Sequence, residues 1–149
     1  MTDEERNVEI QRLAADLFEV AGAMRRDGET IARRVGQSQA RWQVMWVADT
    51  GGLTVPGVAR RLGVTRQHVQ RVANDLVADR LATFDANPDH RRSPLLRLTP
   101  QGHEILDEIN RGAARRNLQT AAELGDDGTR RLRELLDDVR RALRTHPPA

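Results

Sequence analysis

The chain has 149 residues, with 24 basic residues (all arginine) against 22 acidic ones, and a net charge of +2. This length fits one domain with a core of its own, and the lack of cysteine excludes disulfides, a thiol switch and a thiolate zinc site. The acidic start and the lack of any apolar run of about 20 residues predict no signal peptide, no membrane span and a cytoplasmic protein.

The N-terminal third predicts two helices. Three acidic residues suit a helix start, both as caps and through the helix dipole: Asp3, Glu4 and Glu5. Apolar residues follow at helical spacing and predict a long helix that ends near Gly36. Its apolar stripe is longer than a small domain can bury alone, so both a partner-binding helix and an ordinary core helix remain open interpretations. Ser38 is the expected N-cap of a second helix, Gln39 to Asp49.

The middle of the chain carries most of the positive charge. Residues 60–97 hold 8 Arg and 4 Asp, a sum of +4, whereas residues 1–59 (7 Arg, 9 acids) sum to −2 and residues 98–149 (9 of each) to zero. A polyanion such as DNA would bind where the positive charge is concentrated.

Residues 55–78 have the spacing of a helix-turn-helix. A short strand at 53–55 precedes the first of the two helices, Thr54 can cap it, and Pro56 suits its first turn. Gly63 allows a tight turn, Thr65 is a natural N-cap for the second helix, and a stripe of apolar residues faces inward: Val69, Val72 and Leu76.

The outward face of that second helix carries side chains that can contact DNA. Arg66, Gln67 and Gln70 are candidates for reading base edges. Arg71 and Asn74 are expected nearer the phosphates, where Thr65 could also bind, and His68 could either touch DNA or pack at the helix start. The alternative for each of them is solvated surface.

Two short alternating segments, Leu81–Asp85 and Leu95–Leu98, flank a polar, basic tip and predict a β-hairpin wing. Arg91 is the strongest candidate of the tip, with Arg92 beside it, because a thin, permanently charged guanidinium can enter a minor groove. Asp89 is expected to orient an arginine by a charge-assisted hydrogen bond. The alternative is a solvated basic loop.

The C-terminal third predicts two more helices. Thr99 and Pro100 open the first of them, residues 125–129 break the pattern, and a leucine-rich amphipathic helix then runs to the residue before His146.

In its order of elements, the chain resembles the MarR family of bacterial transcription regulators, over essentially its full length. The most specific part of the resemblance is the segment 89–102, with an Asp-x-Arg, a strand that ends in Leu-Thr, and a Gly three residues after that Thr. Residues 39–45 are also similar to the family's second helix. Two residues depart from the family's pattern: Arg80 stands where Gly is common, and Phe84 where a basic residue is common.

The resemblance implies a mainly α fold with a small β-hairpin wing. Residues 37–99 would be the DNA-binding lobe of a single domain (1–149), and residues 1–36 and 100–146 would be dimerisation helices. The resemblance also implies a homodimer that places paired recognition helices on a near-palindromic operator in double-stranded DNA, often with a small ligand that relieves repression.

A ligand site is suggested by the scarce aromatic residues. Trp42 and Trp46 are four residues apart on one helix face, and Met45 and Phe18 could join them around a small aromatic or phenolic effector. The other interpretation places these side chains in the core or in the dimer interface.

No motif for catalysis, a metal or a cofactor is visible, since no two of the four histidines lie three or four residues apart, no cysteine is present, and no nucleophile triad or phosphate loop occurs. We therefore expect no enzyme but a dimeric, sequence-specific DNA-binding regulator, acting as a repressor. The alternative is a winged-helix protein-interaction or ligand-binding module without specific DNA binding. The Arg and Gln of the outward face argue against a protein interface, which uses aromatic and aliphatic anchors.

Overall fold

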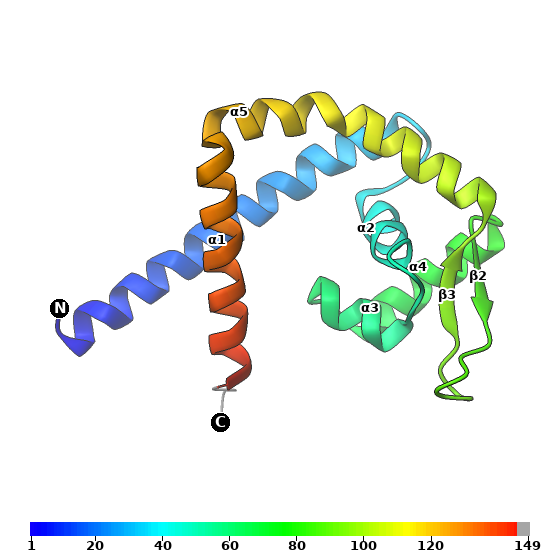
Figure 1. The fold of residues 1–149 in the computed structure, drawn as a ribbon, viewed down its shortest axis with the longest axis horizontal. Helices are drawn as coiled ribbons and strands as arrows, with labels where there is room; N and C mark the ends of the chain where they lie inside the picture. The colour runs from blue at the N-terminus through cyan, green and yellow to red at the C-terminus, as the bar shows by residue number, and fades with distance from the viewer. Residues whose placement is uncertain (146–149) are drawn as a thin grey trace. The chain divides into compact units, whose positions relative to one another are not determined.

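The computed structural model describes residues 1–145, which form five helices and a small sheet (Figure 1). The elements follow in the order α1 (Asp3–Arg33), α2 (Gln39–Ala48), β1 (Leu53–Thr54), α3 (Val55–Leu62), α4 (Arg66–Ala78), β2 (Ala82–Asp85), β3 (Leu95–Leu98) and α5 (Pro100–Thr145). The mainly helical fold with a hairpin wing confirms the predicted fold class. No helix in this range combines the length and the apolar character that crossing a membrane requires.

Every helix of the described range begins after a serine or threonine whose hydroxyl accepts the backbone N–H three residues later. Such a cap satisfies one of the N–H groups that the first turn leaves without a partner, and contributes about 1 kcal/mol. Four of these caps are those that the sequence predicts: Ser38, Thr54, Thr65 and Thr99. The N-cap of α1 is Thr2, which the sequence analysis did not name, and Glu5 completes a reciprocal capping box with it. The three acidic residues occupy the first turn of α1 as predicted.

A second bond fixes the start of α2. The Glu29 carboxylate of α1 accepts the backbone N–H of Gln39 at 2.8 Å and the Arg33 side chain at 2.8 Å. The Gln39 N–H and then Arg33 lower the pKa of Glu29, because both favour its charged form. The carboxylate therefore ties the end of α1 to the first turn of α2.

The core lies among α2, α3, α4, the sheet and the first turns of α5. The inward stripe of α4 is buried as its spacing predicts. Trp42 of α2 and Ile31 of α1 pack against this core and are partly buried. The largest side chains that are fully buried are Met45, Leu76, Leu96, Leu106 and Ile109.

The sheet has the order β1-β3-β2, with β3 antiparallel to both neighbours. Leu96 of β3 pairs with Leu53 on one side and with Phe84 on the other. The predicted short strand before the helix-turn-helix is thus present as β1. It joins the start of α3 directly to the wing.

Residues 1–112 form one compact unit, and residues 113–145 belong to a second. Helix α5 runs through both and contains one non-helical residue, Gly125, with φ 68° and ψ 163°. Glycine tolerates this conformation at little cost, whereas other residues rarely adopt it. The predicted break at 125–129 is therefore confined to its first residue. The predicted domain and dimerisation boundaries stay predictions, and His146 lies outside the described residues.

Candidate nucleic-acid interface

The turn between α3 and α4 sets the direction of α4. Gly63 adopts a left-handed conformation (φ 66°, ψ 35°), and the backbone N–H of Val64 donates to Ala59 across the turn. Thr65 then accepts the backbone N–H of His68 at 3.1 Å and starts α4. Because Ala59 and Val69 are buried at the contact between the helices, α4 is held in one orientation against α3.

With its apolar stripe buried, α4 exposes the residues predicted to face DNA. Arg66, Gln67, Gln70, Arg71 and Asn74 are all exposed, as is the capping Thr65, whereas His68 is half-buried. The structure therefore brings these candidates together on one face of one helix.

Four of these side chains restrain one another in pairs. The Gln70 amide donates to Asn74 Oδ1 at 2.9 Å, and Arg71 lies 3.4 Å from His68 Nδ1. A side chain held by a neighbour loses less conformational entropy when it binds a ligand. Gln70 and Asn74 are thus presented as a unit, one helical turn apart.

The wing tip is organised by Asn87, which the sequence analysis did not single out. Its amide donates to the Ser93 carbonyl at 2.8 Å, and its side-chain oxygen accepts the backbone N–H of Asp89 at 3.0 Å. The signal for this turn is an asparagine directly before proline, because Asn commonly bonds the backbone two residues on. Asn87 thereby closes the loop that carries Arg91 and Arg92.

Arg91 and Arg92 are exposed, and within the described residues neither has an ion-pair or hydrogen-bond partner. The predicted pairing of Asp89 with an arginine is not present. Its carboxylate is exposed, and an exposed ion pair gains only about 0–1 kcal/mol against full hydration. The ion pair of the wing joins Arg97 to Asp85 instead, at 3.5 Å.

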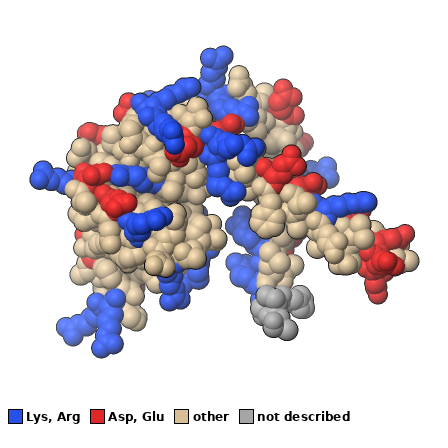
Figure 2. All heavy atoms as spheres, turned by 180° about the vertical axis from the view of Figure 1, so that it is seen from behind, with Lys and Arg blue, Asp and Glu red and all other residues tan. Residues whose placement is uncertain are grey.

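The charges are unevenly spread over the unit 1–112. Figure 2 shows basic side chains protruding at the end of the wing, at the lower left, while acidic side chains gather at the N-terminal end of α1, at the right. The basic side chains at the end of the wing therefore lie away from the acidic end of α1.

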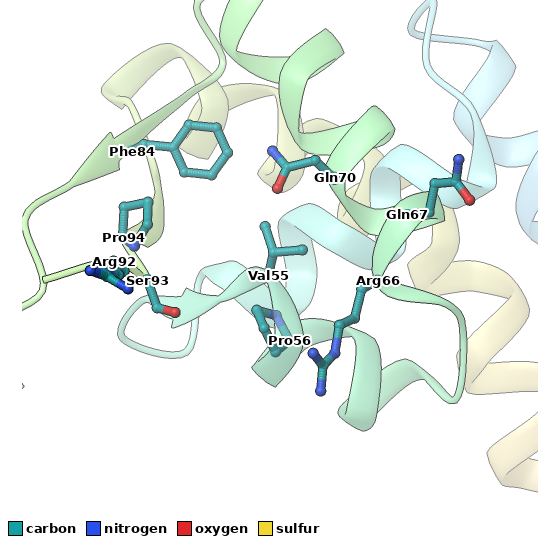
Figure 3. A pocket seen from close by; sticks show the side chains of 9 residues that line it. All are labelled: Val55, Pro56, Arg66, Gln67, Gln70, Phe84, Arg92, Ser93 and Pro94. Atoms are coloured by element: carbon teal, nitrogen blue, oxygen red, sulfur yellow. The ribbon is translucent and has the colours of Figure 1, made fainter. Parts of the chain in front are cut away.

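A cavity of about 510 Å³ opens between α4 and the wing (Figure 3). We call it the wing groove. The Phe84 ring faces Gln70 across it, and the Arg66 and Arg92 side chains lie on opposite sides of Pro56. The groove is lined by Val55, Pro56, Arg66, Gln67, Gln70, Phe84, Arg92, Ser93 and Pro94.

The end of α4 is formed by a residue with positive φ. Arg80 has φ 60°, its N–H donates to the Val77 carbonyl at 3.0 Å, and the N–H of Leu81 donates to the Leu76 carbonyl at 2.9 Å. These two bonds and the buried leucine pair form a Schellman motif, in which glycine is the usual left-handed residue. Arg80 therefore adopts the strained conformation and does not end the helix differently.

Thr99 joins the end of α4 to the start of α5. Its hydroxyl donates to the Arg80 carbonyl at 2.7 Å and accepts the N–H of Gly102 at 3.0 Å, while its own N–H donates to the Leu81 carbonyl at 3.1 Å. Gly102 is buried against the same carbonyl, where a Cβ atom would have no room. The residues 80–81 and 99–102 thus form one tightly packed junction.

Among residues 1–145, the predicted ligand residues differ in burial, and none of them lines the wing groove. Met45 is fully buried in the core, while Trp46 and Phe18 are 51% and 77% exposed. Trp42 is partly buried, and its indole N–H donates to Asn110 Oδ1 at 3.1 Å. Met45 therefore has the core role that the alternative interpretation gives it, and a ligand role for the others stays a prediction.

One histidine of α5, His103, contacts a carboxylate of α2. His103 Nδ1 lies 2.9 Å from Asp49 Oδ1 of α2. In residues 1–145, no group of three His, Cys, Asp or Glu side chains is placed to hold a metal ion.

Comparison with known proteins places this geometry in a family. The model of the MarR family matches residues 37–93, which contain α2, the helix-turn-helix and the wing tip. An uncharacterised protein of Mycobacterium tuberculosis is 49% identical over 140 residues, which are 94% of this chain and 98% of that protein.

Solved structures share the fold over most of the chain. The MarR/EmrR family transcriptional regulator of Acinetobacter sp. ADP1 has a TM-score of 0.81 at 18% identity, covering 91% of this chain and 97% of that one. NadR in complex with 4-hydroxyphenylacetate has a TM-score of 0.78 at 19% identity, covering 85% and 91%. A MarR mutant from E. coli complexed with operator DNA has a TM-score of 0.73 at 20% identity, covering 88% and 95%. The chain belongs to the MarR family of winged-helix transcription regulators, which are DNA-binding proteins and not enzymes.

Proposed function

We propose that the chain is a homodimeric, sequence-specific DNA-binding repressor of the cytoplasm. Helix α4 enters a major groove, and the wing enters the adjoining minor groove with Arg91. The observation that carries this proposal is the shared exposed face of α4 and the wing, where Arg66, Arg91 and Arg92 have no carboxylate partner in the described residues. Unpaired guanidinium groups on one face are complementary to phosphates and to the negative potential of a minor groove.

The proposed homodimer accounts for apolar side chains that the single chain leaves exposed. On α1, Ile10, Phe18 and Met24 are 63–77% exposed, and in the second unit Leu118 and Leu143 are 71% and 69% exposed. Exposed apolar residues along two helices indicate a surface that another chain covers. With two copies, the recognition helices would contact half-sites about one helical turn, roughly 10 bp, apart.

The proposed effector is a small aromatic or phenolic compound, bound next to Trp46 and Phe18 where a second copy completes the site. The proposal is supported by the exposure of both aromatic side chains and by the structural similarity to NadR, which was solved with 4-hydroxyphenylacetate. Titration with 4-hydroxyphenylacetate should change the tryptophan fluorescence and release the DNA. Unchanged fluorescence and DNA affinity across a panel of aromatic acids and phenols would contradict an effector of this class.

The function is tested by fluorescence anisotropy with DNA from upstream of the chain's own gene. A scrambled duplex serves as the control, at about 50 and 200 mM salt. We expect binding to the upstream DNA to survive at the higher salt, while binding to the scrambled duplex is lost. Equal, salt-sensitive binding to both duplexes would contradict an operator in that region. A duplex selected from a random-sequence pool would then decide between a distant operator and the interaction-module alternative.

A further inference from the structure

The wing groove lies between the two elements that we propose enter DNA. In a duplex, a major groove and the adjoining minor groove are separated by one sugar-phosphate strand. A protein with α4 in the first groove and the wing in the second must hold that strand between them. The cavity between α4 and the wing is therefore where the strand would pass.

The rim of the wing groove is basic. Arg66 comes from α4 and Arg92 from the wing, on opposite sides of the opening, and neither is paired in the described residues. Among the residues that the structure describes, no aspartate or glutamate lines the groove. A guanidinium binds a phosphate through charge-assisted hydrogen bonds, so this rim is complementary to an anionic strand.

The floor of the groove is apolar. Val55 and Pro56 come from the start of α3, and Phe84 and Pro94 come from the wing. Phe84 is held partly buried against the core, so its ring has a fixed position. Deoxyribose presents C–H groups between its charged phosphates, and it can therefore pack on this floor while the phosphates reach the arginines.

We propose that the wing groove binds one sugar-phosphate segment of the operator, with a deoxyribose on Phe84 and Pro94 and the phosphate or phosphates that flank it bound by Arg66 and Arg92. This inference rests on the proposed function. It assigns Arg66 to the DNA backbone and not to the base edges. It also gives a role to Phe84: the ring supplies affinity that salt does not screen.

The test uses the full-length protein and the tightest duplex that it selects from a random-sequence pool. Arg66→Ala and Arg92→Ala should each weaken binding by about tenfold or more and lower the slope of log K against log salt by about 0.9. A set of duplexes then carries a neutral methylphosphonate in place of one phosphate at a time. Replacing one particular phosphate, or either of two adjacent phosphates on the same strand, should remove the difference in affinity between wild type and both arginine variants. We say that an arginine couples to a phosphate when neutralising that phosphate removes the effect of the arginine variant. The proposal would be overturned if the two arginines coupled to phosphates on different strands, or to no phosphate.

Phe84 separates the sugar contact from the phosphate contact. Phe84→Ala should weaken binding severalfold without changing the salt slope, and Phe84→Leu should stay close to wild type because it keeps an apolar floor. If Phe84→Ala folds by circular dichroism and binds like wild type, the sugar contact is wrong. If that variant does not fold, the phosphate scan with wild-type protein still decides whether the strand lies in the groove.

A charge-matched control excludes a general effect of removing one arginine. Arg111→Ala removes an exposed arginine of α5, outside the wing groove, and should couple to no phosphate. Failure of the proposed function would appear differently: wild-type protein would not distinguish the selected duplex from a scrambled one, and the groove proposal would fall with it. Intact specific binding without coupling of Arg66 and Arg92 would overturn the groove proposal alone.

Discussion

Replacing Arg80 by glycine should stabilise the protein. An L-amino acid in the left-handed conformation costs roughly 1–2 kcal/mol, which glycine avoids. Glycine in turn loses about 0.5–1 kcal/mol through its greater freedom in the unfolded chain. The midpoints of the two ranges leave a net gain of about 0.75 kcal/mol, or about 1.5–3 °C in Tm for a chain of this length.

The structure supports this arithmetic because only backbone groups of Arg80 are bonded. Its N–H donates to Val77 and its carbonyl accepts the Thr99 hydroxyl, and glycine keeps both groups. The side chain is exposed and has no partner among the described residues, so its removal should cost little.

The assay is urea unfolding followed by circular dichroism, with all variants at one protein concentration because a dimer's stability depends on concentration. Arg80→Ala is the control, since it removes the same side chain but keeps a Cβ atom. We expect the order of stability to be Arg80→Gly above wild type, with Arg80→Ala within about 0.5 kcal/mol of wild type. If Arg80→Gly is no more stable than Arg80→Ala, the strain argument is refuted.

Three further predictions concern the junction, the dimer and the wing. Gly102→Ala places a Cβ against a backbone carbonyl and should cost roughly 3 kcal/mol or more in urea unfolding, whereas Gly112→Ala, where the new Cβ meets only a methyl group at 3.5 Å, should fold normally. Equal stability of the two variants would refute the packing argument. Leu135→Glu puts a charge on the exposed apolar stripe of α5 and should shift the mass measured by light scattering from two chains toward one; an unchanged mass would exclude this stripe from the dimer contact. Arg91→Ala should weaken operator binding and lower its salt slope by about 0.9, and wild-type binding at every salt concentration would remove the wing from the interface.

Much of the fold follows from local sequence signals. The apolar spacing of α4, the caps at Thr54 and Thr65, and the left-handed turn at Gly63 each depend on residues within one or two helical turns. Such signals act over a few residues, so they can be recognised in a single sequence.

The parts that the sequence did not predict depend on contacts between distant residues. The wing groove combines side chains from 55–56, 66–70, 84 and 92–94, and no spacing within one segment indicates it. The ligand hypothesis also depended on distant contacts, which the spacing of residues in one helix does not reveal. Trp42 and Trp46 lie on one helix face, but they differ in which residues pack over them. Asn110, from α5, bonds the first, while the second is half exposed.

The junction around Thr99 makes α4 and α5 mechanically dependent on each other. A shift of the first turn of α5 would have to break the bonds of the Thr99 hydroxyl and N–H or carry residues 80–81 with it. Because Gly102 leaves no free space at this contact, the end of α4 and the start of α5 are packed rigidly against each other. Any molecule that displaces the start of α5 should therefore also tilt α4, the helix that we propose reads the DNA, and the same bonds would carry a signal from a bound operator back to α5.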